Sequence, residues 1–145
     1  MPNENVALLH RWFEEVWNKG RAEAIEEMFA ADGIAYGLGE AGVNVRGPVQ
    51  YRPFFDKLRG AFPDFYLRIE DTVAEGDKVA ARWTAEMTHQ GDTLGLPATG
   101  KKVAVTGMTI VRVRDGKITE AWNNWDVMSL MQQINAGVEV RLLEH

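Results

Sequence analysis

The chain has 145 residues, 46% of them hydrophobic, which is the size of a single domain with a substantial core. Its 16 basic and 21 acidic residues give a formal charge of −5, so no basic surface for nucleic acid or an anionic membrane is expected. Cysteine is absent, which excludes disulfides, thiolate metal sites and a cysteine nucleophile. That absence is typical of a reducing compartment, and we expect a cytoplasmic protein.

The two ends of the chain carry no export or membrane signal in our interpretation. The segment MPNENVALLHRWFEEV is a polar cap followed by an amphipathic pattern, and no apolar run approaches membrane-spanning length. Leu143-Glu144-His145 resembles the start of an expression-vector histidine tag. We therefore expect one domain over residues 1–142 and a tag remnant at 143–145.

The first part of the chain is predicted to be helical. Apolar residues recur at helical spacing from Val6 to Trp17, and a shorter repeat runs from Arg21 to Ala30. After a brief apolar run comes a glycine-rich loop, and Gly47-Pro48 then opens a third helical stretch that extends to Phe62. Three helices are therefore expected before the chain changes character.

From Pro63 onward the sequence predicts strands. The period changes to two or to short β-rich runs over residues 65–74, 79–90, 103–114 and 117–125. Glu75-Gly76-Asp77 and Asp115-Gly116 are hairpin signals, so the strands that they join should be antiparallel. A longer connection over residues 91–102 should lie over the mouth of the sheet, and a short helix is expected over residues 127–135. The fold class is α+β, with helices on one side of a curved antiparallel sheet.

Four segments of the sequence resemble a known family. They are FEEVWNKG, AFPDFYLRIEDTVAEGDKVAARWT, THQGDTLGLPATGKKV and VRDGKITEAWNNWDVMSLMQQ, in this order. Together they are similar to the SnoaL-like polyketide cyclases, also called ester cyclases, over about residues 5–136. The resemblance implies the cone-shaped α+β barrel of the nuclear-transport-factor-like proteins, with three N-terminal helices on the concave face of the sheet. One such scaffold hosts cyclases, isomerases, hydrolases, dehydratases and binding modules.

Asp126 is the first candidate for a catalytic residue. Strict alternation places Trp122, Asn124 and Asp126 on one strand face, and the resemblance puts that face inward and matches Asp126 to a general acid/base. A carboxylate held among tryptophan and methionine side chains is poorly solvated, which raises its pKa towards neutrality and suits acid/base work. The alternative is that Asp126 caps the C-terminal helix by accepting backbone N–H bonds near Ser129.

Two further residues are candidates through the resemblance. His89 stands where the family places a histidine near the pocket mouth, and it could orient Asp126 or bind a substrate oxygen. Its alternative role is a strand-end histidine bonded to a backbone carbonyl. Tyr36 departs from the family, in which many members carry a histidine around this position. Its phenol could donate a hydrogen bond to a developing enolate oxygen, or it could simply fill the core.

The aromatic residues are expected to form the core, because aromatic side chains dominate burial energetics in small domains. A few of them should also line the pocket, and the proposed substrate-binding set is Trp12, Tyr36, Phe55, Trp83, Trp122 and Asn124. The three histidines do not occur at metal-ligand spacing with acidic partners, so no metal is expected. The glycines between Gly37 and Gly47 lack a dinucleotide-binding pattern, so no nucleotide cofactor is expected.

Two functions follow as hypotheses. The first is a cofactor-independent enzyme that closes a ring in a small hydrophobic carbonyl compound by intramolecular aldol addition, with Asp126 shuttling the proton. The second is a binding module, or a related isomerase or hydrolase, that takes the same kind of ring-containing ligand. The fold that the resemblance implies commonly pairs through the convex face of its sheet. We expect a homodimer in which Val111, Val113 and Trp125 face outward.

Overall fold

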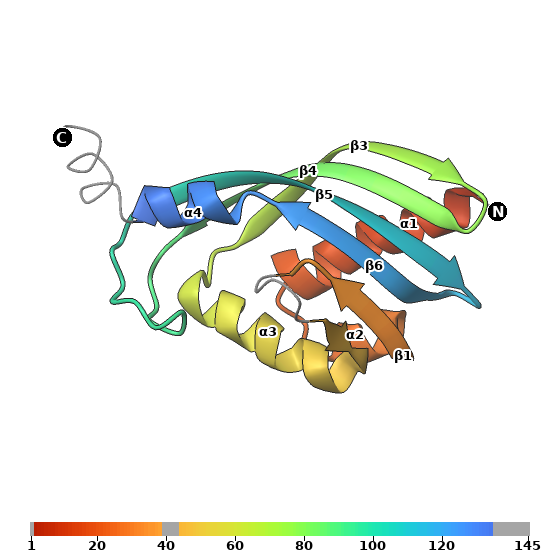
Figure 1. The fold of residues 1–145 in the computed structure, drawn as a ribbon, viewed down its shortest axis with the longest axis horizontal. Helices are drawn as coiled ribbons and strands as arrows, with labels where there is room; N and C mark the ends of the chain where they lie inside the picture. Colours follow the sequence, from red (N-terminus) through yellow and green to blue (C-terminus); the bar gives the residue numbers. More distant parts are fainter. Residues whose placement is uncertain (1, 39–43, 135–145) are drawn as a thin grey trace.

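The structure is a computed structural model that describes residues 2–38 and 44–134. Within these residues it forms a curved six-stranded sheet with helices on its concave side, which confirms the α+β class (Figure 1). The last residue of the predicted C-terminal helix, Asn135, and the predicted tag remnant at 143–145 lie outside the described residues. No helix in the described part of the chain is both long enough and apolar enough to cross a membrane.

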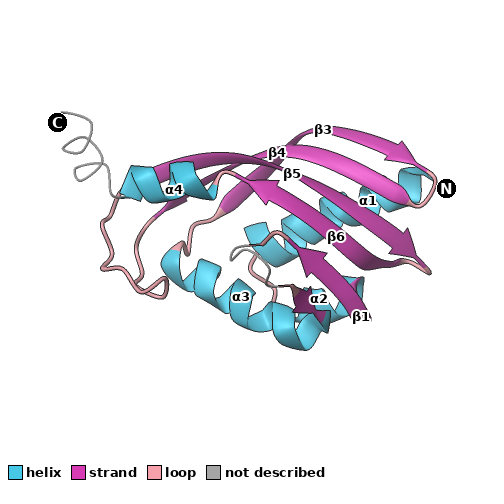
Figure 2. Cartoon of the chain, viewed as in Figure 1, coloured by secondary structure: helices cyan, strands magenta, loops and turns pink. Residues whose placement is uncertain are grey.

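The helical region follows the predicted order. Helix α1 (Pro2–Trp12) continues directly into the π-helical turn η1 (Phe13–Asn18), and α2 (Glu23–Met28) follows. The long helix α3 (Gly47–Ala61) has Pro48 in its first turn, as the Gly-Pro pair predicted. The predicted second helix was too long, because its last residues, Phe29 and Ala30, already belong to a strand. All three helices lie beneath the arch of the sheet (Figure 2).

The sheet contains two strands that the sequence patterns did not define. Strand β1 (Phe29–Tyr36) pairs in parallel with β6 (Lys117–Trp125), and the short β2 (Val45–Arg46) covers its outer edge. The other strands are β3 (Tyr66–Glu75), β4 (Lys78–Thr88) and β5 (Lys102–Arg114). The strand order is β2-β1-β6-β5-β4-β3, and every pair except β1 with β6 is antiparallel. The two predicted hairpins are confirmed.

The core lies between the concave face of the sheet and the helices. Along β5, alternate residues from Val103 to Val113 point to the core, and Val111 and Val113 are almost fully buried. The expectation that these two valines face outward is therefore wrong. Aromatic rings fill the space below the sheet, and Trp17 alone contacts the rings of Tyr51, Phe54, Phe55 and Phe65. Short helix α4 (Val127–Ile134) closes one end of the cone.

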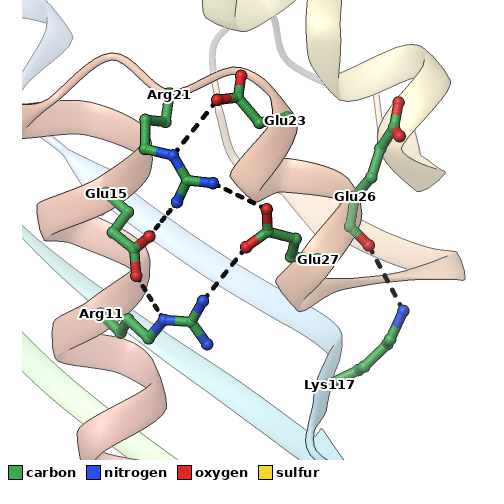
Figure 3. A network of polar contacts seen from close by, with 7 residues as sticks. All are labelled: Arg11, Glu15, Arg21, Glu23, Glu26, Glu27 and Lys117. Atoms are coloured by element: carbon green, nitrogen blue, oxygen red, sulfur yellow. Dashed lines mark hydrogen bonds and ion pairs between the residues drawn. The ribbon is translucent and has the colours of Figure 1, made fainter.

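A network of charged side chains fastens η1 and α2 together on the outside of the cone (Figure 3). Arg21 contacts Glu15, Glu23 and Glu27, and Arg11 contacts both Glu15 and Glu27. The hydrogen bond from Arg11 lowers the pKa of Glu15. Because exposed ion pairs of this kind contribute little stability each, the network fixes the orientation of the two helices rather than supplying most of their attachment.

Candidate functional site

A β-bulge decides which side chains of β6 enter the cone. Arg112 pairs with Glu120 but Val113 pairs with Ile118, so Thr119 is an extra residue in β6. Ile118 faces the core, and strict alternation from it would have turned every second residue up to Asp126 inward. The extra residue shifts the phase, so that Ala121, Asn123 and Trp125 line the interior instead.

The predicted inward orientation of Trp122, Asn124 and Asp126 is therefore wrong. Asn124 and Asp126 are exposed on the outer face of the sheet. Trp122 is partly buried there, where its ring stacks on that of Tyr36 and lies 5.5 Å beneath the ammonium group of Lys78. Trp125, which was expected outside, lines the interior. Tyr36, Trp122 and Asn124 thus have no place in the wall of the cavity inside the cone.

Asp126 occupies the position of a helix cap. It directly precedes α4, and its Oδ1 accepts a hydrogen bond of 2.9 Å from the backbone N–H of Ser129. Its own backbone N–H donates to the carbonyl oxygen of Thr106 at 3.2 Å, which ties the end of β6 to β5. This is the alternative that the sequence left open, and it satisfies one of the unpaired N–H groups at the start of the helix. A catalytic role for Asp126 stays a prediction.

The cone encloses a small cavity, which we call the inner cavity. Its volume is about 60 Å³, and its wall includes the aromatic side chains of Trp12, Phe13, Trp17, Tyr51, Phe54, Phe65, Trp83 and Trp125. Trp12 and Trp83 are thereby placed where a pocket residue should lie, whereas Phe55 is a core residue packed on Trp17. Among the described residues that line this cavity none carries a charge. Such a space favours a neutral, ring-containing molecule over a phosphate or a sugar.

Three polar groups from β4, β5 and β6 form a hydrogen-bonded chain at the wall of the inner cavity. The indole N–H of Trp83 donates to Thr109 Oγ1 at 3.0 Å, and the Thr109 hydroxyl donates to Asn123 Oδ1 at 3.1 Å. The amide nitrogen of Asn123 donates to the backbone carbonyl of Tyr36 at 2.9 Å. An indole only donates and a carbonyl only accepts, so the two ends fix the direction of the chain. The second N–H of the Asn123 amide has no acceptor among the described residues.

Tyr51 of α3 supplies a second neutral donor. It is 4% exposed, and its hydroxyl oxygen accepts a hydrogen bond of 3.2 Å from the indole N–H of Trp17. Within the described part of the chain its own hydroxyl hydrogen meets no acceptor, and the residue lines the same cavity as Asn123. Burial raises the pKa of the Tyr51 phenol far above its ordinary value, because the phenolate would be unsolvated. Tyr51 therefore remains a hydrogen-bond donor at all physiological pH values.

His89 lies outside the wall of the inner cavity. It is fully buried beside the ring of Phe62, at the start of the connection between β4 and β5. The backbone N–H of Thr99 lies 3.3 Å from its Nδ1 and the Thr99 hydroxyl oxygen lies 3.1 Å from the same atom, whereas Nε2 has no partner among the described residues. The backbone of His89 also bonds to Lys101 and Gly100. His89 thus joins the two ends of this loop by hydrogen bonds. It does not contact Asp126, so it does not orient that carboxylate.

The sequence did not predict that Tyr51 and Asn123 line the cavity. Tyr51 lies with Phe55 and Leu58 on the buried stripe of α3, where a helical pattern shows only an aromatic core residue. Asn123 lies on the strand face opposite to the one that the family resemblance had placed inward. A polar residue between Ala121 and Trp125 was the available signal, but it could be read only once the bulge at Thr119 was known.

The described residues contain no group of three or more histidine, cysteine, aspartate or glutamate side chains arranged to hold a metal ion. The inner cavity likewise offers no carboxylate or imidazole among its described wall residues. The absence of a cofactor stays a prediction.

The comparisons with known proteins decide the family. The profile of the SnoaL-like polyketide cyclases matches residues 7–134, which is most of the chain. The chain belongs to this family. A SnoaL-like relative, the aklanonic acid methyl ester cyclase DnrD of Streptomyces peucetius, is 25% identical over 127 residues that cover 87% of this chain and 88% of that protein. The resemblance stated from the sequence motifs is thereby confirmed.

Solved structures agree with this SnoaL-like assignment. A candidate SnoaL-like polyketide cyclase from Jannaschia sp. CCS1 superposes with a TM-score of 0.84 at 26% identity, covering 93% of this chain and 94% of that one. An epoxide hydrolase of M. tuberculosis described as LEH-like has a TM-score of 0.70 at 15% identity over 99% and 98% of the two chains. The second likeness shows only that the fold is shared, and the cone-shaped architecture is confirmed.

Proposed function

We propose that the cone binds a small, neutral, ring-containing carbonyl compound. The observation that carries this proposal is the pair of neutral donors, Tyr51 and Asn123, in an otherwise aromatic cavity wall. A ketone oxygen can accept hydrogen bonds from both groups while its ring lies against the tryptophan and phenylalanine side chains. A charged ligand would lose its hydration without gaining a counter-charge from the described wall. Two cyclase relatives, whose names specify a methyl ester as the compound that they cyclise, support a carbonyl-containing ligand.

A thermal-shift and calorimetric screen tests this proposal. Acetophenone and 1-tetralone should raise the melting temperature, whereas adenosine monophosphate and glucose should not. At a ligand concentration 100 times Kd the stabilisation expected is about 2.7 kcal/mol. Stabilisation by the nucleotide, with none by either ketone, would show that the assignment of ligand class is wrong.

Ring closure is the second candidate function, and the names of the cyclase relatives favour it. An intramolecular aldol addition removes a proton from the carbon next to one carbonyl group and joins that carbon to a second carbonyl carbon in the same molecule. Donors at Tyr51 and Asn123 would stabilise the enolate oxygen, and the cavity would hold the two reacting carbons together. Asp126 would accept the proton and return it only if the end of β6 turned its carboxylate from the outer face towards the cavity and released the cap of α4.

Two substitutions of Asp126 separate capping from catalysis. Because asparagine is itself a good cap, Asp126→Asn should leave the free energy of unfolding nearly unchanged, whereas Asp126→Ala should lower it by about 1 kcal/mol. If Asp126 is also the acid/base, Asp126→Asn should reduce turnover of a cyclisable diketone by roughly 10²–10⁴-fold with ligand affinity retained. Full turnover in Asp126→Asn would exclude the acid/base role and leave only the cap.

We also propose a homodimer that pairs through the outer face of the sheet. Five residues in register, one on each of the main strands, form an apolar row across this face: Val73, Ala80, Ile110, Trp122 and Tyr36. Val73 is 71% exposed and Ile110 is 40% exposed, and Met108 beside them is 53% exposed. Uncovered apolar rows of this kind on strand faces are typical of contact surfaces.

Sedimentation at micromolar concentration should therefore give twice the monomer mass. Ile110→Glu places a charge in the centre of the row and should yield a monomer, because an unpaired carboxylate would be buried in the pair. The matched substitution Thr106→Glu, on the same strand and the same outer face but outside the row, should leave the dimer intact. A wild-type monomer at this concentration would rule out the proposed assembly.

A further inference from the structure

Trp125 stands between two cavities. The inner cavity has a volume of about 60 Å³, and a second cavity of about 360 Å³, here called the mouth cavity, lies between α3 and α4. Four side chains line both and so form the wall between them: Leu38, Phe54, Leu58 and Trp125. The rest of the mouth cavity is mostly apolar and includes Val45, Leu94, Leu130 and Met131.

Of the four side chains in this shared wall, that of Trp125 is the one that makes a hydrogen bond. Its indole N–H donates to the backbone carbonyl of Leu38 at 2.8 Å, so the plane of the ring is fixed across the passage. Gly107, its register partner on β5, carries no side chain, and the Trp83 ring fills the space beside its Cα. Leu38, Phe54 and Leu58 carry no side-chain hydrogen-bonding group, so packing alone holds them.

The volumes show why this wall matters. A cavity of 60 Å³ holds a few water molecules, whereas ligand sites usually measure about 300–1,000 Å³. The mouth cavity reaches that range, but the donors Tyr51 and Asn123 line the inner cavity and not the mouth cavity. A ring compound whose carbonyl reaches these donors must therefore extend through the wall.

We propose that the Trp125 indole is the partition that a ligand displaces, and that it thereby limits how many fused rings the cone accepts. This inference rests on the proposed ligand-binding function. Release of the indole from the Leu38 carbonyl joins the two cavities into one apolar chamber with both donors at its inner end. A ligand with one ring needs the smallest part of that added space, whereas one with three fused rings needs the largest part. Trp125 is thus a specificity-determining residue rather than a catalytic one.

The test is calorimetric titration with a ring series: acetophenone with one ring, 1-tetralone with two and anthrone with three. Wild-type protein should bind these ketones with affinity that falls as rings are added. Trp125→Ala should reverse that order and bind anthrone at least about tenfold more tightly than wild type, since about 55 Å² of extra buried apolar surface corresponds to a tenfold change in Kd. Trp125→Phe, which keeps a ring but loses the N–H, should lie between the two and preserves the core if the alanine variant fails to fold.

The matched control is Tyr66→Ala, which removes an aromatic ring that is 54% exposed on β3 and lines neither cavity. It should leave the wild-type order of affinities unchanged. Suppose that wild-type protein binds the ketones and that both Trp125 variants keep the wild-type dependence on ring number. The proposal that Trp125 limits ring number is then refuted, while the proposed ligand-binding function stands. Binding by the Trp125 variants alone would support the partition and refute the wild-type function. Absence of binding in all the proteins would refute both.

Discussion

Tyr51→Phe is expected to weaken binding of acetophenone by about 10- to 100-fold, because a ligand carbonyl would be buried without its donor at a cost of about 1–3 kcal/mol. The substitution removes one oxygen atom and leaves the ring that packs against Trp12 and Phe29. Trp17 also loses the acceptor for its indole N–H, so a moderate loss of stability should accompany the loss of affinity. Isothermal titration gives the affinity, and urea unfolding gives the stability.

The same variant should change the response to alkaline pH. Burial raises the pKa of Tyr51 in the folded protein, whereas the unfolded chain has an ordinary phenol pKa of about 10. The folded state therefore binds the proton more tightly, and its contribution to stability is complete below pH 10. Above that pH the unfolded chain releases the proton first, so this contribution falls by about 1.4 kcal/mol per pH unit. Tyr51→Phe should lose this part of the alkaline dependence.

Tyr66→Phe is the control, since Tyr66 is 54% exposed on β3 and lines no part of the inner cavity. It should change neither ketone affinity nor the alkaline slope. Ketone binding that survives unchanged in Tyr51→Phe would mean that the phenol does not contact the ligand. An alkaline slope equal to that of wild type would mean that the hydroxyl is solvated in the folded state.

Gly107→Ala is expected to destabilise the protein by about 1–3 kcal/mol, the usual cost of overpacking a core. Gly107 lies on the inner face of β5 directly between Trp83 on β4 and Trp125 on β6. A Cβ atom there would collide with the six-membered part of the Trp83 ring. The ring cannot yield easily, because its N–H is bonded to Thr109 and it is only 6% exposed. The free energy of unfolding in urea measures the effect.

A double-mutant cycle with Trp83→Phe provides the control. The smaller ring should make room for the new methyl group, so the double variant should be more stable than the sum of the two single losses predicts. The ring displaced in Gly107→Ala should also enter the inner cavity and reduce ketone affinity. Additive losses in the cycle would show that the cost of Gly107→Ala arises in the backbone of β5 and not at the Trp83 ring.

The local pattern of the sequence was sufficient for the order of elements and for the class of fold. Helical spacing from Val6 to Trp17 and alternation through β4 and β5 each depend on the side chains of one segment, so they can be recognised without a partner. The turns at Gly76 and at Asp115-Gly116 adopt positive φ, as their residue types indicated, and they fixed the antiparallel pairs. The family motifs added the cone-shaped architecture, which the profile match and the solved structures confirm.

Strand β1 could not be predicted from the pattern of its own residues. Its residues Phe29–Tyr36 include Asp32 and Gly33, which resemble the end of a helix more than the middle of a strand. Parallel pairing with β6, almost 90 residues further along the chain, makes this segment a strand. Strand β6 satisfies the backbone groups along one edge of β1, and β2 does so along part of the other edge. Neither partner can be identified from the sequence of this segment alone.

The composition of the binding cavity was decided by tertiary structure alone. The sequence contains a strand with Asn123 and Trp125 on one face and Asn124 and Asp126 on the other, and its alternation is equally consistent with either face inward. One extra residue, Thr119, pairs with no residue of β5 and reverses the phase of everything that follows it. Because side chains alternate with period two, that single bulge exchanges a carboxylate for an amide inside the cone. The sequence determined which groups were available, and the register against β5 determined which of them a ligand can meet.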